Sequence, residues 1–147
     1  MNPTELSSRV DALALFFEQL KPTDVSRLGE FYAADAWFKD PFNEVTGLPE
    51  IERIFRHMFA ALHEPHFVVT GRMAQGSECF LVWELRFRFR RFDVKRWQTV
   101  RGASHLRWND QGRVVWHRDY WDAAEELYEK LPGLGVLMRW LRRQANR

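Results

Sequence analysis

The feature of this sequence that most constrains its fold is a change in the spacing of apolar residues close to His66. Before that point, apolar residues recur every three or four positions, which is typical of helices with one buried face. After it, and as far as Trp121, apolar and polar residues alternate, which is typical of strands with one buried face. The order predicts an α+β chain in which helices come first and a largely antiparallel sheet follows.

Three N-terminal helices are predicted. The first begins at Asn2-Pro3-Thr4-Glu5, where Asn2 can cap the helix and Glu5, three residues later, can complete a capping box with it. The second runs from Thr23 to Tyr32, and the third begins at Pro49. The apolar stripes of the first and third helices are Leu6, Val10, Leu13, Phe17 and Leu20, and Ile51, Ile54, Phe55, Met58, Phe59 and Leu62.

A short strand ending at Asp40 and four longer strands, at about 66–74, 79–91, 95–108 and 114–121, are predicted to form the sheet. In the last strand, Val115, His117, Asp119 and Trp121 are expected to share the inner face, because alternate residues of a strand point the same way. The chain ends helically, at 124–131 and 134–141, and the final helix is expected to pack over the sheet or over the mouth of a pocket. This order predicts a cone, in which the third helix closes a bent sheet around a pocket.

The chain length and a hydrophobic share of 46% predict a single compact domain spanning residues 1–147. The 15% aromatic share suits either a thick core or the wall of a small-molecule cavity. A net charge of +2 and a lone cysteine, Cys79, favour no nucleic-acid partner, no disulfide and a reducing cytoplasm. No membrane-spanning run, metal site or cofactor motif is found, so we expect no membrane partner, no metal and no cofactor.

Asp40 is the first candidate for chemistry. Pro41 holds it in extended geometry, and Phe38 and Phe42 flank it. A carboxylate among aromatic rings loses hydration, which suits it to exchanging protons near neutral pH. The alternative is structural, because an Asp before a turn often accepts hydrogen bonds from nearby backbone amides.

His117 and Asp119 are the second candidates, because they lie two apart on the predicted inner face of the last strand. A buried carboxylate requires a partner, and the neighbouring imidazole can supply one. A catalytic or ligand-orienting role and a purely structural contact both remain open.

Three segments resemble the nuclear transport factor 2-like superfamily, which includes SnoaL-like cyclases, ketosteroid isomerases and limonene epoxide hydrolases. These segments are Phe31 to Phe42, Gly47 to Phe59 and Trp108 to Asp122. The resemblance implies a cone-shaped, curved, mixed sheet wrapped around helices, and a homodimer formed through the convex sheet face.

Particular residues acquire roles through this resemblance. Asp40 falls where the isomerases keep their general base, whereas Phe16 and Ser104 replace the two groups that stabilise the oxyanion there. The segment Arg118 to Asp122 is similar to the last-strand signature of the epoxide hydrolases and places Asp119 at a catalytic acid. In a cyclase-like reaction, Asp40 or Asp119 would act as the base, assisted by His117.

The sequence therefore predicts a protein that binds a small apolar organic molecule, with Asp40, His117 and Asp119 as catalytic candidates. Acid/base chemistry of the cyclase, isomerase or hydrolase type is one expectation, and a non-catalytic binding or dimerisation domain is the other. The residues predicted to contact the ligand, several of which could equally be core, are Phe16, Tyr32, Trp37, Phe42, Met58, Ser104 and Trp121.

Overall fold

The computed structural model describes residues 1–146 and confirms the mixed α+β architecture. The three N-terminal helical segments are α1 (Pro3–Glu18), the 3₁₀ helix η1 (Pro22–Glu30) and α2 (Leu48–Ala61). The predicted capping box at the start of α1 is present, because Asn2 and Glu5 each accept a hydrogen bond from the other's backbone amide. The second helix was predicted without its type, and its tight 3₁₀ turns follow Pro22.

The strands form one sheet in the order β2-β1-β6-β5-β4-β3. Their bounds are β1 (Tyr32–Lys39), β2 (Glu44–Thr46), β3 (His63–Gln75), β4 (Glu78–Arg88), β5 (Gln98–Trp108) and β6 (Val114–Tyr120). All neighbours are antiparallel except β1 and β6, which run parallel. The parallel pairing brings the strand that ends beside Asp40 against the strand that carries His117, so Phe38 lies opposite His117.

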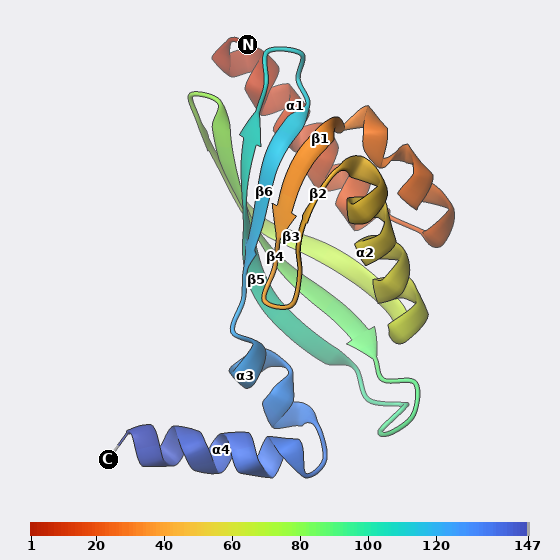
Figure 1. Ribbon diagram of the computed structural model, residues 1–147, viewed down its shortest axis with the longest axis vertical. Coiled ribbons are helices and arrows are strands. Elements are labelled where there is room, and N and C mark those ends of the chain that lie inside the picture. Colours follow the sequence, from red (N-terminus) through yellow and green to blue (C-terminus); the bar gives the residue numbers. More distant parts are fainter. Residues whose placement is uncertain (147) are drawn as a thin grey trace.

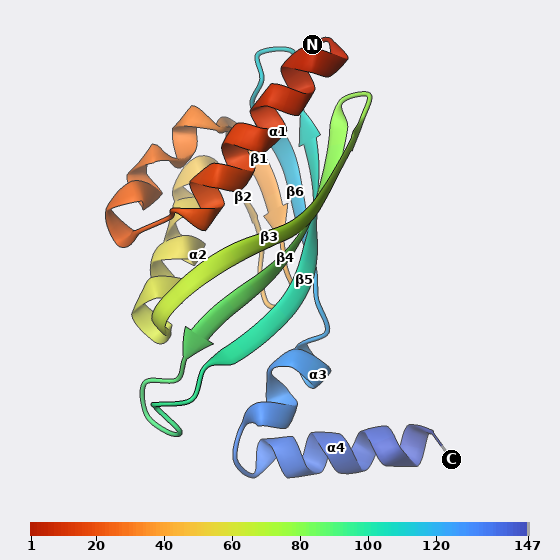
Figure 2. The same ribbon diagram turned by 180° about the vertical axis from the view of Figure 1, so that it is seen from behind.

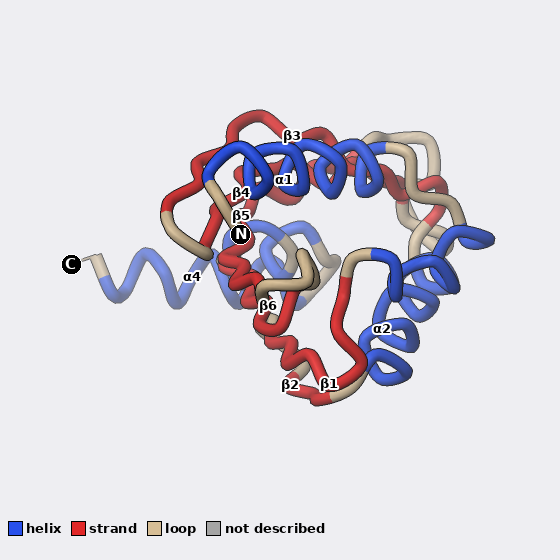
Figure 3. The backbone as a smooth tube through the Cα atoms, turned by 90° about the horizontal axis from the view of Figure 1, so that it is seen from above, coloured by secondary structure: helices blue, strands red, loops and turns tan. Residues whose placement is uncertain are grey.

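The sheet is strongly curved, and its concave side faces the helices (Figure 1). Helix α1 lies along β3, and α2 packs near β1 and β2 and reaches one part of β3 (Figure 3). The core between these layers includes Leu13, Leu28, Ile51, Leu81 and Leu106, each no more than 1% exposed. The curved sheet and its helices thus pack around a shared core, in the arrangement of the predicted cone.

One predicted face needs correction. The pairing of β5 with β6 slips between Arg107 and Trp108, so that Val115 is the extra residue of a bulge. The bulge turns Val114 into the core, where it is fully buried, and leaves Val115 only partly buried. His117, which follows the bulge, keeps the predicted inward direction and is 2% exposed.

The C-terminal segment comprises α3 (Ala123–Glu126), η2 (Tyr128–Lys130) and α4 (Leu134–Ala145). The expectation that the final helix packs over the sheet is wrong, because α4 contacts η2 and points away from the sheet in both side views (Figure 2). The shorter α3 is held against β5, where Glu126 pairs with Arg101 at 2.7 Å. No helix among residues 1–146 has the length and apolar character needed to cross a bilayer.

Candidate functional site

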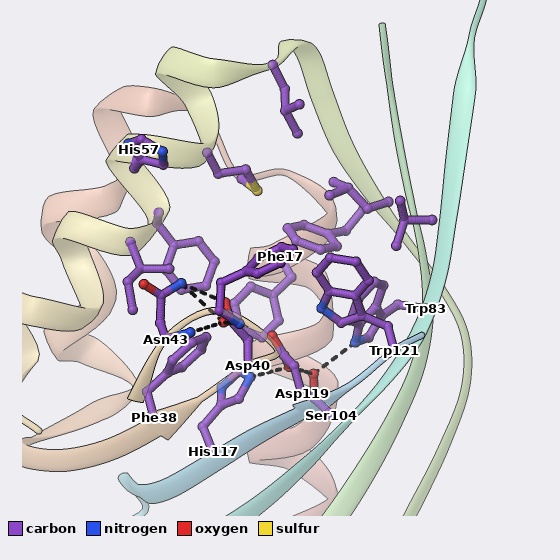
Figure 4. A pocket seen from close by; sticks show the side chains of 18 of the residues that line it. Phe17, Phe38, Asp40, Asn43, His57, Trp83, Ser104, His117, Asp119 and Trp121 are labelled. Carbon is purple, nitrogen blue, oxygen red and sulfur yellow. Dashed lines mark hydrogen bonds and ion pairs between the residues drawn. The ribbon is translucent and has the colours of Figure 1, made fainter. Parts of the chain in front are cut away.

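A cavity of about 350 Å³ lies between the concave face of the sheet and α2. Its wall is mainly apolar, and its polar residues include a group from the β1–β2 turn, β5 and β6 (Figure 4). The aromatic residues of the wall are Phe17, Phe38, Phe42, Phe55, Phe67, Trp83, Phe87 and Trp121. A mainly apolar hollow with a few grouped polar side chains is the usual form of a small-molecule site.

Trp83 forms part of this wall because Gly102, opposite it on β5, has no side chain. A Cβ atom built on Gly102 would lie 2.5 Å from Cη2 of Trp83, which is a severe overlap. The absence of a side chain lets the indole ring lie flat on β5 and brings its Nε1 to 2.8 Å from Oγ of Ser104. The glycine in this strand therefore positions a hydrogen bond.

Asp119 receives one hydrogen bond from the neighbouring strand β5 and one from its own strand β6. The Ser104 hydroxyl donates to Oδ1 of Asp119 at 2.5 Å, and Nε2 of His117 lies 2.6 Å from the same oxygen. Since Trp83 donates to Ser104, the donors form a chain that ends at one carboxylate oxygen (Figure 4). A carboxylate oxygen has the lone pairs to accept from both donors.

The second ring nitrogen of His117, Nδ1, contacts Tyr32, which lies behind the ring. Burial, followed by the nearby charge of Asp119, raises the pKa of Tyr32 well above its usual value, so its hydroxyl keeps its proton. The hydroxyl lies 2.6 Å from Nδ1 of His117 and has no other hydrogen-bond partner among residues 1–146. In the neutral form of the imidazole, Tyr32 donates to Nδ1, which leaves the ring hydrogen on Nε2, directed at Asp119.

The second oxygen of Asp119, Oδ2, has no hydrogen-bond partner within the described part of the chain, and the side chain borders the cavity. The Asp119 side chain is 17% exposed, whereas that of His117 is 3% exposed. Asp119 therefore has one oxygen fixed by the protein and one free to accept a proton or a hydrogen bond from a molecule in the cavity.

Asp40 is held differently, by its own turn. Its Oδ1 accepts hydrogen bonds from the backbone amides of Phe42 at 2.8 Å and Asn43 at 2.7 Å. The side-chain amide of Asn43 contacts both oxygens of Asp40, at 3.1 and 3.2 Å. This is the turn geometry expected from the structural interpretation of Asp40, although the carboxylate also lines the cavity.

Most of the residues selected from the sequence are brought together by the fold. Those that line the cavity are Asp40, Phe42, Met58, Ser104, His117, Asp119 and Trp121. They come from α2, β5, β6, the β1–β2 turn and the residue that follows β6, so their convergence depends on the tertiary fold. Their roles in binding or catalysis remain predictions.

Three of the selected residues do not line the cavity. Phe16 packs in the core against Phe31, with ring centroids 4.8 Å apart. Trp37 stacks on Trp116 at 5.0 Å, on the face of the sheet opposite Phe38 and His117. Tyr32 is buried behind His117 and acts on the cavity only through that ring.

Among the lining residues that were not selected as site residues, three shape the cavity or its polar group. Phe17 lines the cavity in place of Phe16, and the helical stripe from Leu6 to Leu20 already contained it. Trp83 belonged to the apolar face of its strand, but nothing in that alternation separates a cavity wall from core. Asn43 carried no signal in the sequence, because its role depends on the turn made by Asp40.

Residues 1–146 contain no group of three or more His, Cys, Asp or Glu side chains arranged to hold a metal ion. In the hydrogen-bonded group around Asp119, the contacts of Ser104 and His117 satisfy Oδ1 and leave Oδ2 without a partner among residues 1–146.

The family model described as a SnoaL-like domain matches residues 13–117 of the chain. The chain belongs to the SnoaL-like family. The match begins within α1 and ends at His117 within β6, and so includes α2, β1 to β5 and most of the cavity wall. No curated protein matches the sequence.

Solved structures share the fold of this SnoaL-like chain at low sequence identity. A Catenulispora acidiphila protein with a ketosteroid isomerase-like fold, in complex with trimethylamine, has a TM-score of 0.69 and 20% identity over 81% of this chain and 88% of its own. AclR, a putative hydroxylase from Streptomyces galilaeus, has a TM-score of 0.70 and 17% identity over 92% and 98%. An M. tuberculosis LEH-like epoxide hydrolase has a TM-score of 0.67 and 15% identity over 95% and 93%.

Proposed function

We propose that this SnoaL-like protein is an enzyme that moves a proton on a small, largely apolar organic molecule, with Asp119 as the general base. The observation that supports the proposal is the unequal use of the two Asp119 oxygens. Oδ1 accepts from Ser104 and His117, whereas Oδ2 is without a partner among residues 1–146 and faces the cavity. A base needs such a free oxygen, together with a fixed orientation.

His117 and Ser104 are positioning residues in this proposal. The Tyr32 hydroxyl fixes the tautomer of His117, and the Trp83 indole fixes Ser104. Because these contacts come from buried side chains, they hold the carboxylate in one rotamer without contacting the ligand's reacting atoms. Fixed geometry of this kind is what a base in an apolar site requires.

Asp40 is assigned a smaller part than the sequence predicted. Three of its four hydrogen bonds go to Oδ1, and all four come from residues 42 and 43. It shapes the turn at the edge of the cavity and adds negative charge there. The transfer of the proton is given to Asp119.

A small reporter of carboxylate basicity tests the proposal without knowledge of the natural substrate. 5-Nitro-1,2-benzisoxazole is a flat aromatic molecule whose ring opens when a base removes its C3 proton, which gives a coloured phenolate. We expect turnover by the wild type and a loss of about 100- to 10,000-fold in Asp119→Asn. Equal rates in the two proteins, after subtraction of the buffer reaction, would contradict the proposal.

A non-catalytic ligand-binding domain is the second candidate. It is favoured by the mutual satisfaction of Tyr32, His117, Ser104 and Oδ1 of Asp119, which a structural polar cluster would also show. In that case Asp119→Asn would weaken ligand binding while no turnover of the reporter is measured in either protein.

We also propose that the chain forms a homodimer through the convex face of the sheet. Phe80 and Val82 are 39% and 41% exposed on this face, and Phe80 stacks on His105 at 4.4 Å. Exposed apolar residues on a regular sheet face favour association. Light scattering should give about twice the chain mass of 17.6 kDa, and a monomer mass would contradict this.

A further inference from the structure

The acidic side chains of the cavity wall are not matched by lysine or arginine. The residues that line it include two carboxylates, Asp40 and Asp119, and no lysine or arginine. The basic residues that adjoin these carboxylates in sequence, Lys39 and Arg118, instead border a separate outer hollow that also touches Asp40 and Asp119. Lys39 pairs there with Glu44 at 3.6 Å, and Arg118 lies over the ring of Tyr120 at 4.8 Å.

The side-chain donors of the polar group are also already used. The Asn43 amide donates to Asp40, and Ser104 and His117 donate to Asp119. The Trp83 indole donates to Ser104. Two other lining residues carry a polar hydrogen. The Trp121 indole has no hydrogen-bond partner among residues 1–146, and His57 is exposed on α2 and stands apart from this group (Figure 4). The group therefore presents free acceptor atoms to the cavity and directs its donors at its own carboxylates.

The rest of the wall supplies aromatic surfaces. Phe17, Phe38, Trp83 and Trp121 are drawn around the two carboxylates in Figure 4 and line the same cavity. The face of an aromatic ring attracts a cation, and an indole does so most strongly. A nearby carboxylate in an apolar setting adds to that attraction, because little water screens it.

We propose that the ligand of this cavity carries positive charge, as an alkylammonium group joined to an apolar body. An anion would meet two carboxylates and no free side-chain donor of the polar group. A neutral molecule would gain only from the apolar wall, whereas an ammonium group would gain from the carboxylates and the rings. The inference rests on the proposed function only in that the same cavity receives the ligand.

A matched pair of probes tests the charge preference. Phenyltrimethylammonium and tert-butylbenzene have the same shape and differ by one quaternary nitrogen in place of carbon. We expect the cation to bind the wild type at least about tenfold more tightly, a difference of about 1.4 kcal/mol, measured by calorimetry or by competition at low salt. In Asp119→Asn this preference should largely disappear, while the affinity for tert-butylbenzene stays the same.

Asp35→Asn is the matched control, because Asp35 is an exposed carboxylate on β1 that does not line the cavity. It should keep the full preference, and near-ultraviolet circular dichroism of each variant should match that of the wild type. Equal binding of the two probes by the wild type, binding of neither, or a preference that survives in both Asp119→Asn and Asp40→Asn would overturn the inference.

The two proposals fail separately in these experiments. Phenyltrimethylammonium has no acidic proton on nitrogen, so its binding reports charge recognition without proton transfer. If the charge preference is absent but turnover of the benzisoxazole still depends on Asp119, the assignment of Asp119 as general base is supported and the cationic ligand is refuted. If the preference is present and turnover does not depend on Asp119, the cationic ligand is supported and the general base is refuted.

Discussion

Two carboxylates border the same cavity, yet the chain holds them by different means. Asp40 is bound by the backbone and side chain of the residues that directly follow it. Asp119 is bound by Ser104 from the neighbouring strand and by His117, which is itself held by Tyr32 from β1. The first arrangement forms a turn wherever the local sequence occurs, whereas the second exists only when β1, β5 and β6 are assembled. A carboxylate that the whole sheet positions is the better candidate for chemistry.

The strongest way to break this comparison is to neutralise each carboxylate in turn. Asp119→Asn should lower turnover of the benzisoxazole by about 100- to 10,000-fold, because an amide cannot accept the proton. Asp40→Asn should keep a rate close to that of the wild type, since an asparagine oxygen can accept the same backbone hydrogen bonds. The reverse order of effects, measured under identical conditions, would move the base to Asp40.

Alkaline pH should lower the free energy of unfolding, because two buried groups of the sheet, Tyr32 and Cys79, ionise there. Burial raises the pKa of Cys79 to about 11 and that of Tyr32 well above its usual value. Both groups are therefore neutral in the folded chain where the unfolded chain has begun to ionise. Stability is fully present below pH 9 and falls as pH rises from about 9 to 11, by at most about 2 to 3 kcal/mol for Cys79.

Urea unfolding between pH 8 and pH 11 measures this loss. Cys79→Ala should flatten the fall above pH 9, and Tyr32→Phe should flatten the part that begins near pH 10. An unfolding free energy that stays constant across this range would show that neither group is shielded by the fold.

Gly102→Ala should disturb the hydrogen bonds that hold Asp119 and leave the turn at Asp40 unchanged. The new methyl group would overlap Trp83, which must tilt and release Ser104. We expect a loss of about 1 to 3 kcal/mol in stability, as for other overfilled cores, together with weaker probe binding. Chemical denaturation and calorimetry measure the two effects, and wild-type values in both would mean that the ring has room to move.

The smallest effect is expected at the turn itself. Asp40→Ala removes the acceptor for the amides of Phe42 and Asn43, and should cost about 1 kcal/mol of stability. Asp40→Asn is the control, because it retains an acceptor oxygen and should unfold close to the wild-type denaturant concentration. A large loss of turnover in Asp40→Ala with unchanged stability would contradict the structural role.

The order of helices and strands was predictable because each long element has its own apolar spacing. β2 was missed, since Glu44–Thr46 is too short to show an alternation and is held by its pairing with β1. Val115 was assigned to the inner face because alternation was extended through a bulge, which depends on the partner strand. Periodicity describes an element but does not describe its pairing.

The candidate site was predicted in part for the same reason. His117 and Asp119 share a strand, so their proximity follows from spacing alone. The contact between Tyr32 and His117 joins residues 85 positions apart, and it depends on the parallel pairing of β1 with β6. Trp37 was wrongly expected to contact the ligand. An aromatic residue on a short strand does not show which face of the sheet it occupies until the pairing of that strand is known.

The most direct test of the difference between the two carboxylates is an NMR titration of the protein labelled with ¹³C at the aspartate Cγ carbons, with phenyltrimethylammonium as the added probe. The predicted result is a saturable shift of the Asp119 signal, larger than that of Asp40, with no shift at Asp35. A probe that binds and moves only the Asp40 signal, or moves neither, would contradict the assignment of the free oxygen of Asp119 to the ligand.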